Sequence, residues 1–412
     1  MAGHVQDRWY KTETDPDGKE RRAKTDRYGT GMRYRARYIG PDGTEKSKSF
    51  PDKQKRLADK WLSNVEADMT RGQYVDPRTA KTTFQQFTEK WLQSHGVDPR
   101  TLESMRSQLK LHAFPHIGSR PLGSFQPSHI REWVAVLEST VAGSYGRTIY
   151  ANVRAAFSAA VDDGHLSRNP FSAGSVRPPA LDTKRVMPWT AERVFAVRQA
   201  MPERYRAMVD LGAGCGMRQG EILGVALDSI DFDSETLHVG QQLKLSRSKP
   251  VFALPKGGKD RNVPLPGPVA DILRDHVKRY PPVEITLPWR TPDGPKVTKR
   301  LIFMAPGGNH VWRTSLNEEA WKPALVEAGV IAPPENKEDR YAAAREHGMH
   351  ALRHFYASAL LDRGENIKAV SEYLGHSNAA LTLRIYAHLM PSSQERTRSA
   401  IASVYKATRS EN

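Results

Sequence analysis

The chain contains almost no cysteine and no long hydrophobic run. Its 412 residues include one cysteine, Cys215, so an internal disulfide cannot form and a reducing compartment is favoured. Cys215 stands among small residues in GAGCGM, which indicates a buried hydrophobic position more than a nucleophile. No apolar stretch is long enough to span a bilayer, and MAGHVQDRWYKTETDPDGKE has no apolar signal core. We therefore expect a soluble cytoplasmic protein without membrane contact.

Several common catalytic motifs are also missing. The glycine turns APGGNH and PKGGKD lack the Lys-Ser/Thr ending of a phosphate loop, and no G-x-S-x-G nucleophile elbow occurs. His350 and His354 are four residues apart, a spacing that suits a metal on a helix. However, Ala351 stands where the zinc-protease motif needs a glutamate base. We expect no metal and no cofactor.

Acidic residues are too few to balance the basic ones. Lys and Arg total 62 against 46 Asp and Glu, which gives a formal net charge of +16. A polyanionic partner is indicated, and nucleic acid comes first because Lys and Arg neutralise its phosphates. A basic protein of the membrane surface is the rival class, but neither a basic amphipathic helix nor a lipidation motif is found.

Residues 1–78 are predicted to form a small module. GMRYRARYIGPDGTEKSKSF alternates at period two around GPDGT, which predicts two strands and a turn, and DKQKRLADKWLSNVEADMTRGQY then has helical spacing. Arg33, Arg35 and Arg37 fall on alternate positions, where they repel one another unless an anion lies against them. They are candidate DNA contacts, and a solvated sheet face is the alternative.

Residues 79–178 are predicted to form a four-helix bundle. VDPRTAKTT marks the boundary before it, and helix starts are signalled at Thr83 and at Ser128, just after a proline. The stretch SAGSVRPPALDTKRVMPWT has the composition of an extended linker.

Residues 186–412 are predicted to form an α+β domain. Helices flank a middle in which 237–265 predict three short strands and 281–309 are irregular, with a strand-like LIFM. Helices return at 316–330, at MHALRHFYAS and at 395–408. The expected fold class is thus a multidomain chain, mainly α with small β-sheets.

MHALRHFYAS carries charge in a segment with the apolar spacing of a buried helix. Met349, Leu352 and Tyr356 recur at three- and four-residue steps, whereas His350 and Arg353, three apart, share a neighbouring stripe. Such a stripe suits a pocket that needs fixed positive charge.

Other polar residues occur in a recurring order with this segment. GMRQGEIL holds Arg218 and Glu221, three apart on a helix that begins near Arg218. Lys256 is expected at the tip of a β-hairpin, and LGHSNAALTLRIYAHL has His376 followed ten residues later by Tyr386. Singly, a buried arginine is more often part of an ion pair and such a tyrosine more often part of a core.

Taken in order, these motifs resemble the tyrosine recombinase family of phage integrase type. The similarity extends through GMRQGEILGVALDSIDF and through the sequence from MHALRHFYAS to Tyr386. Residues 190–405 are similar to the catalytic domain, 82–175 to the helical core-site-binding domain and 1–75, less specifically, to the arm-site-binding domain of lambda-like integrases.

The resemblance implies a role for each residue. Arg218 and Arg353 would clamp the scissile phosphate and His376 would add a hydrogen bond, because phosphoryl transfer builds negative charge that fixed donors stabilise. Tyr386 would be the nucleophile of a 3′-phosphotyrosyl intermediate, with His350 as its proton acceptor.

The resemblance also suggests how the leaving group is protonated. Lys256 would protonate the leaving 5′-oxygen, and Lys259, three residues later in the same turn, is its rival. Glu221 is expected to orient the arginine helix without transferring a proton.

The activity implied is site-specific recombination at attachment sites, which integrates or excises a phage or mobile element without ATP, metal or other cofactor. The implied partners are double-stranded DNA of core and arm type and a homotetramer on two duplexes, with an excisionase and a host DNA-bending protein as further candidates. A type IB topoisomerase and a non-catalytic DNA-binding regulator are the alternatives.

Overall fold

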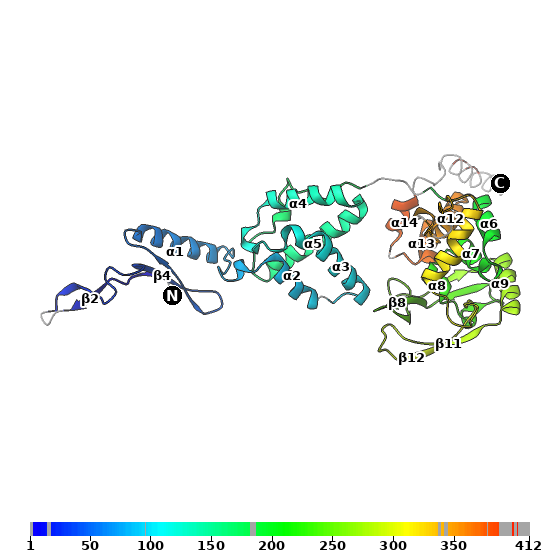
Figure 1. Ribbon diagram of the computed structural model, residues 1–412, viewed down its shortest axis with the longest axis horizontal. Coiled ribbons are helices and arrows are strands. Elements are labelled where there is room, and N and C mark those ends of the chain that lie inside the picture. Colours follow the sequence, from blue (N-terminus) through cyan, green and yellow to red (C-terminus); the bar gives the residue numbers. More distant parts are fainter. Residues whose placement is uncertain are drawn as a thin grey trace, which may run out of the picture. The chain divides into compact units, whose positions relative to one another are not determined.

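The computed structural model describes residues 3–14, 18–94, 96–181, 187–336, 339–341, 345–376 and 378–386, with the single positions 398 and 402. The chain forms two compact units, residues 1–183 and 184–412 (Figure 1). The helix expected at 395–408 lies outside the described residues apart from positions 398 and 402. Within the described ranges, no helix has the length and apolar character that crossing a membrane requires.

The first unit begins with a three-stranded antiparallel sheet in the order β1-β4-β5, made of His4–Asp7, Tyr34–Ile39 and Glu45–Phe50. Helix α1, Lys55–Thr70, packs on one face of it over Tyr34, Ala36 and Tyr38. The predicted strand pair around GPDGT and its helix are confirmed. Strand β1 and the hairpin of β2 (Tyr10–Thr14) and β3 (Glu20–Lys24) were not predicted from the sequence.

The same unit continues into the predicted four helices. They are α2 (Phe84–Gln93), α3 (Pro99–His112), α4 (Pro127–Thr140) and α5 (Gly143–Asp162), with a π-helical turn at Phe114–Gly118. Thr83 caps α2 in a capping box with Gln86, as its position predicts. Helix α4 begins at Pro127, one residue before the predicted start, because proline fits the first turn of a helix.

The second unit is largely helical. Its helices are α6 (Ala191–Ala200), α7 (Glu203–Gly214), α8 (Gln219–Leu223), α9 (Gly267–Arg279), α10 (Arg313–Ser315), α11 (Lys322–Glu327), α12 (His350–Asp362), α13 (Ile367–Leu374) and α14 (Ala379–Tyr386). A π-helical segment, Leu316–Trp321, joins α10 to α11. Helix α13 contacts both α12 and α14 (Figure 1).

The strands of this unit differ from the sequence prediction. Residues 237–265 contain parts of four strands, not three: β7 (Thr236–Val239), β8 (Gln242–Ser246), β9 (Lys249–Ala253) and β10 (Arg261–Pro264). The central sheet has the order β10-β7-β6, with β6 at Ile230–Asp231, while β8 and β9 pair separately.

The segment expected to be irregular is a regular antiparallel hairpin. Strand β11 (Val283–Pro288) pairs with β12 (Lys296–Leu301), so only Leu301 of LIFM belongs to a strand. Ile285 and Leu287 are buried while their neighbours Glu284 and Thr286 are exposed, which is the alternation of a half-buried strand. The prolines and the charged residues hid this pattern in the sequence.

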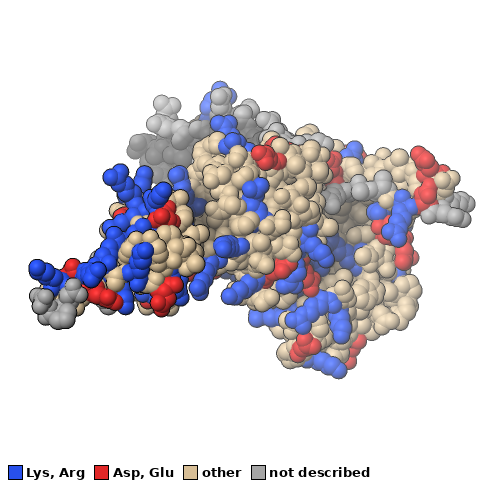
Figure 2. Space-filling view, turned by 60° about the vertical axis from the view of Figure 1, so that its left-hand side comes forward, with Lys and Arg blue, Asp and Glu red and all other residues tan. Residues whose placement is uncertain are grey.

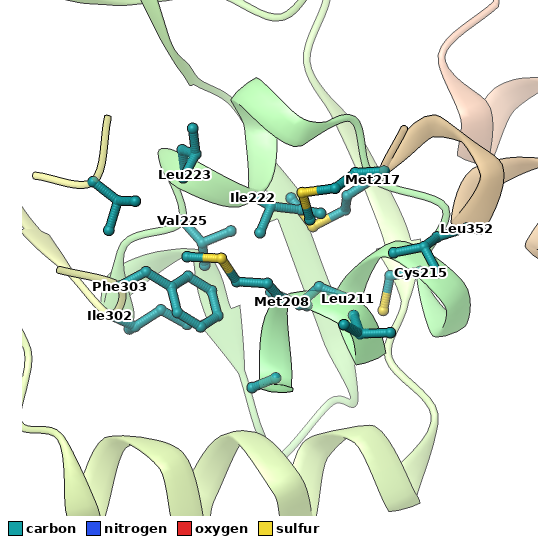
Figure 3. Packing of buried hydrophobic residues seen from close by; sticks show 14 of the residues in the cluster. Met208, Leu211, Cys215, Met217, Ile222, Leu223, Val225, Ile302, Phe303 and Leu352 are labelled. Atoms are coloured by element: carbon teal, nitrogen blue, oxygen red, sulfur yellow. The ribbon is translucent and has the colours of Figure 1, made fainter. Parts of the chain in front are cut away.

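A hydrophobic core supports the short helix α8. Figure 3 shows Met208, Leu211, Cys215 and Met217 from α7 and the turn after it packed beside Ile222 of α8 and Leu352 of α12. Cys215 is fully buried, as its sequence context predicts, and burial raises the pKa of its thiol to about 12. This core therefore joins the helices that carry Arg218 and Arg353.

Candidate active site

Arg218 stands at the N-terminus of α8, held there by a tight turn. Gly216 adopts φ +63°, and a Cβ at this position would lie 2.4 Å from the Tyr356 ring, so only glycine fits. Arg218 is the N-cap residue, and the Glu221 carboxylate accepts hydrogen bonds from its backbone N–H at 2.9 Å and from its Nη1 at 2.8 Å. The expected role of Glu221 in orienting this arginine is supported by these bonds.

A second arginine, Arg261 of β10, completes this ion-pair network. It donates through Nη1 and Nη2 to Glu221 at 3.1 and 2.8 Å, and through Nε to the Tyr373 carbonyl at 2.6 Å. Glu221 is fully buried. Burial raises the pKa of its carboxyl, but hydrogen bonds from Arg261 and the charges of Arg261 and Arg218 outweigh this and hold the pKa at about 2. Sequence spacing gave no signal for Arg261.

Arg353 projects from α12 into the same region and is 1% exposed. Its Nη1 donates to the Gly216 carbonyl at 2.8 Å, and its Nη2 donates to the Leu374 carbonyl. Burial, followed by the charge of Arg218, lowers its pKa to about 9, so the guanidinium remains protonated at neutral pH. Because Arg218 donates to the next carbonyl, that of Gly375, at 3.2 Å, both arginines contact one short turn after α13.

His376 follows that turn directly. Its Nδ1 is 2.7 Å from Oγ1 of the buried Thr382 on α14, a contact that fixes the ring. Burial and then the charges of Arg353 and Arg218 lower the pKa of His376 to about 4, so it is a neutral hydrogen-bonding group at pH 7. His376, a residue named from the sequence, thus follows the turn that both arginines contact, whereas Thr382 had no distinguishing signal in the sequence.

His350 stands at the solvent-exposed first turn of α12. Its ring lies edge-on to that of His354, with 4.7 Å between the ring centroids. Although the residue is exposed, its ring loses part of its hydration, and this, followed by the charges of His354 and Arg353, lowers its pKa below the ordinary value. Within the described ranges, no group of three or more His, Cys, Asp or Glu side chains is arranged to hold a metal ion.

Tyr386 ends α14 and is 1% exposed. Its hydroxyl is 2.6 Å from Nδ1 of His354, not bonded to His350. Burial raises the pKa of the hydroxyl to about 12, although the charge of Arg353 acts in the opposite direction. From the sequence, Tyr386 was named as the candidate nucleophile, whereas His354 was weighed only as a metal ligand. The contact between these two side chains joins α12 to α14 and could not be inferred from sequence spacing.

The two candidate lysines lie elsewhere than expected. Lys256 and Lys259 are both exposed in the turn that joins β9 to β10. Those strands belong to different sheets, so Lys256 is not at a hairpin tip as predicted; the turn of the β8–β9 hairpin is at Arg247 and Ser248. Neither lysine has a hydrogen bond to another side chain in the described part of the chain, so the geometry does not choose between them.

The three arginines of the N-terminal sheet have partners inside the chain. Arg33 precedes β4 and pairs with Asp7 at 2.9 Å and Asp52 at 2.8 Å. Arg35 donates to Ser47 Oγ at 2.9 Å, and Arg37 pairs with Glu45 at 2.6 Å. The spacing of these arginines predicts an anion beside them, and carboxylates of the chain itself supply part of that negative charge. Arg35 and Arg37 lie on the sheet face opposite α1.

The arrangement in the second unit is one of fixed donors beside a hydroxyl. Arg218, Arg353 and His376 converge around the turn after α13. The charge of Arg353 also acts on the pKa of the Tyr386 hydroxyl. Such a set matches the developing charge of a phosphodiester under attack by a side-chain oxygen. Fold and site together are those of a tyrosine recombinase.

Comparison with known families agrees. Residues 187–393 match the phage integrase family and residues 83–137 match the N-terminal SAM-like domain of phage integrases. The chain belongs to the phage integrase family.

Named relatives carry the same assignment. A tyrosine recombinase XerC-like protein of Caldanaerobacter subterraneus is 30% identical over 250 residues, which cover 57% of this chain and 60% of that protein. A putative prophage phiRv2 integrase of Mycobacterium tuberculosis is 24% identical over 390 residues, covering 90% of this chain and 93% of that one.

Solved structures show the same fold. The Tn1549 transposon integrase in complex with transposon right end DNA has a TM-score of 0.64 at 20% identity, covering 78% of this chain and 99% of that chain. A lambda integrase tetramer bound to a Holliday junction has a TM-score of 0.53 at 16% identity, covering 84% of this chain and 93% of that chain.

The buried Glu221 predicts how acid affects the second unit. The pKa of the Glu221 carboxyl is about 2 in the folded protein and near 4.5 in the unfolded chain. The ionised carboxylate therefore stabilises the fold above pH 4.5, and this contribution is lost as pH falls toward 2. Between pH 5 and 2.5 the loss is about 2 kcal/mol. Glu221→Gln should therefore show a flatter pH dependence of the unfolding free energy, together with lower stability at pH 7.

Denaturant unfolding followed from pH 7 to 2.5 measures this difference. Glu284→Gln on β11, which removes an exposed carboxylate, is the matched control and should retain the wild-type profile. If Glu221→Gln kept the wild-type slope, the assigned ionic network would be wrong.

Proposed function

We propose that this chain is a site-specific integrase that cuts and rejoins DNA at attachment sites through a covalent 3′-phosphotyrosyl intermediate. The observation that carries the proposal is the convergence of Arg218, Arg353 and His376 beside Tyr386, from four separate stretches of chain. Integration of a phage or mobile element is the biological reaction that the integrase relatives suggest.

The proposed chemistry follows from the charge of the site. Arg218 and Arg353 hold the non-bridging oxygens of the phosphate, and His376 donates a further hydrogen bond, so the extra negative charge is stabilised as Tyr386 attacks. The phosphotyrosine conserves the energy of the phosphodiester, so the reaction needs no ATP, and the fixed cations supply the positive charge that a metal ion supplies elsewhere. Lys256 is our choice for protonating the leaving 5′-oxygen, with Lys259 as its rival.

The N-terminal unit is proposed to hold the DNA. Residues 79–178 would bind the core site and residues 1–78 the arm site, leaving 186–412 for catalysis. Lys and Arg are spread across the face shown in Figure 2, in keeping with the net charge of +16. Arg35 and Arg37, on the open face of the β1-β4-β5 sheet, are the residues we assign to arm DNA, since a sheet face can enter a groove.

The assembly is proposed to be a homotetramer on two duplexes, located in the bacterial cytoplasm on the nucleoid. The lambda integrase tetramer on a Holliday junction, which shares this fold, supports that stoichiometry. An excisionase and a host DNA-bending protein are proposed as further partners that control the direction of the reaction.

Tyr386→Phe tests the covalent mechanism. Labelled DNA from beside the gene is incubated with the wild type and the variant in EDTA, and SDS-resistant adducts are counted. The wild type should form an adduct, and the variant should form none while binding DNA with unchanged affinity, because only the attacking oxygen is lost. A variant that retained the adduct would assign the nucleophile to another residue, whereas a wild type that bound tightly without an adduct would favour a DNA-binding regulator.

The phosphate clamp predicts a separation of binding from chemistry. Arg218→Ala and Arg353→Ala should lower the cleavage rate by at least about 100-fold, as loss of a transition-state donor does, with at most a tenfold loss of DNA affinity. Arg274→Ala removes an exposed arginine of α9 and is the matched control for charge. Cleavage by either clamp variant at near the wild-type rate would contradict the assignment; circular dichroism shows whether each variant is folded.

The sheet face predicts a salt-dependent contribution to arm binding. The double change of Arg35→Gln and Arg37→Gln should weaken arm-DNA binding. The slope of the logarithm of the binding constant against the logarithm of the salt concentration should become shallower by about one for each phosphate that the variant no longer neutralises. Arg56→Gln, an exposed position of α1 across from that face, should change neither. Titrations at several salt concentrations give both slopes; equal slopes for the double variant and the control would remove this face from the interface.

A further inference from the structure

The nucleophile has a partner that the proposed chemistry has not yet used. Nδ1 of His354 lies 2.6 Å from the Tyr386 hydroxyl, and the two rings are 5.6 Å apart between centroids. His354 directly follows Arg353 on α12, and its carbonyl accepts a hydrogen bond from Ser358 Oγ at 2.7 Å. His354 therefore lies on the same helix as Arg353, and Tyr386 is the partner of its imidazole.

The direction of the hydrogen bond follows from burial. Tyr386 is 1% exposed, and His354 Nδ1 is the partner of its hydroxyl in the described part of the chain. If Nδ1 carried the hydrogen and donated it, the phenolic O–H would be a buried donor without an acceptor, at a cost of about 1–3 kcal/mol. The favoured tautomer therefore has its hydrogen on Nε2, and Nδ1 accepts the proton of Tyr386 in a hydrogen bond.

We propose that His354, and not His350, accepts the proton of Tyr386 during strand cleavage. The inference rests on the proposed integrase function and deepens it by changing the residue that acts as the base. His350 was assigned this part from the family resemblance, but it lies at the exposed start of α12 and has no hydrogen bond to Tyr386 within the described residues.

The step balances without any further reactant. As the bond from Tyr386 Oη to phosphorus forms, the phenolic proton passes to Nδ1 of His354, which becomes an imidazolium. The bond from phosphorus to the 5′-oxygen breaks, and that oxygen takes its proton from the lysine of the β9–β10 turn. In rejoining, the 5′-hydroxyl attacks phosphorus and gives its proton back to the neutral amine of that lysine. The bond from phosphorus to Tyr386 Oη breaks, and the imidazolium of His354 returns its proton to the departing Tyr386 oxygen.

The surroundings of His354 keep its imidazole in the neutral form. Burial and the charge of Arg353 lower its pKa to about 4, so the ring is uncharged and has a lone pair available at neutral pH. The titratable and charged groups that face it are Tyr386, His350, whose ring contacts its own, and Arg353 and His376. A bound phosphodiester offsets the two guanidinium charges, which makes the imidazole a stronger base when DNA is present.

The test compares substitutions that keep or lose proton transfer. His354→Gln keeps a hydrogen-bond acceptor but cannot take up the proton, and His354→Ala loses both. Each full-length variant is assayed for SDS-resistant adduct on the wild-type cleavage site, and for binding to the same DNA. Ser358→Ala, which removes a bond to the His354 carbonyl without touching the imidazole, is the matched control.

We expect His354→Gln to cleave at least about 100-fold more slowly than the wild type, with binding within threefold, because general-base catalysis contributes 10²–10⁴-fold. Ser358→Ala should remain near the wild-type rate. Cleavage by His354→Gln within fivefold of the wild type would overturn the proposal. It would mean that the imidazole only positions the Tyr386 hydroxyl, a role that the glutamine amide can also fill.

A substrate with sulfur in place of the leaving 5′-oxygen separates the base from the acid. A thiolate leaves without protonation, so this substrate restores variants of the leaving-group lysine, but it should not restore His354→Gln. Restoration of His354→Gln would move His354 to the leaving-group side and overturn the proposal. The wild-type result separates a failure of the proposed function from a failure of the His354 assignment. If the wild type forms no adduct, the proposed function fails. If the wild type and His354→Gln form the adduct equally, only the His354 assignment fails.

Discussion

The site depends on one buried carboxylate. Glu221 lies between Arg218 and Arg261, and Arg261 in turn holds the backbone of Tyr373 near the end of α13. The two guanidinium groups repel each other, and the Glu221 carboxylate between them offsets that repulsion. Arg218 is thereby held at the N-terminus of α8. The helix that begins at Arg218, the strand β10 and the turn before His376 are therefore fixed by a single anion.

The turn after α13 has a similar organising effect. Arg353 donates to the Leu374 carbonyl, Arg218 to the Gly375 carbonyl, and Gly375 itself adopts φ +61° against the Arg261 side chain. A residue with a Cβ would be strained there, so the turn can approach the arginines closely only as glycine. The protein backbone thus orients the arginine donors in advance. If they bind a phosphate as we propose, this is the condition for electrostatic stabilisation without reorganisation.

Part of the candidate site could be predicted from the sequence, because several of its residues lie on or beside helices with a clear apolar spacing. Arg353 and Tyr386 lie on helices whose apolar spacing indicates which way they point. Arg218 and His376 flank helices, and they were found through the order of the motifs, which matches a known family. Arg261 and His354 act through contacts between elements far apart in the chain, Arg261 with Glu221 and His354 with Tyr386, and local patterns do not encode such contacts. The hairpin of β11 and β12 was missed because burial of Ile285 and Leu287 depends on the neighbouring core.

The lone thiol of Cys215 has a practical consequence. It is fully buried in the core that supports the helices of Arg218 and Arg353, and its raised pKa keeps it protonated. A thiol-specific reagent can therefore reach it only when this core opens. The rate of labelling would then report, with a single natural probe and no added tag, how often the second unit transiently unfolds in solution and how far added DNA suppresses that opening.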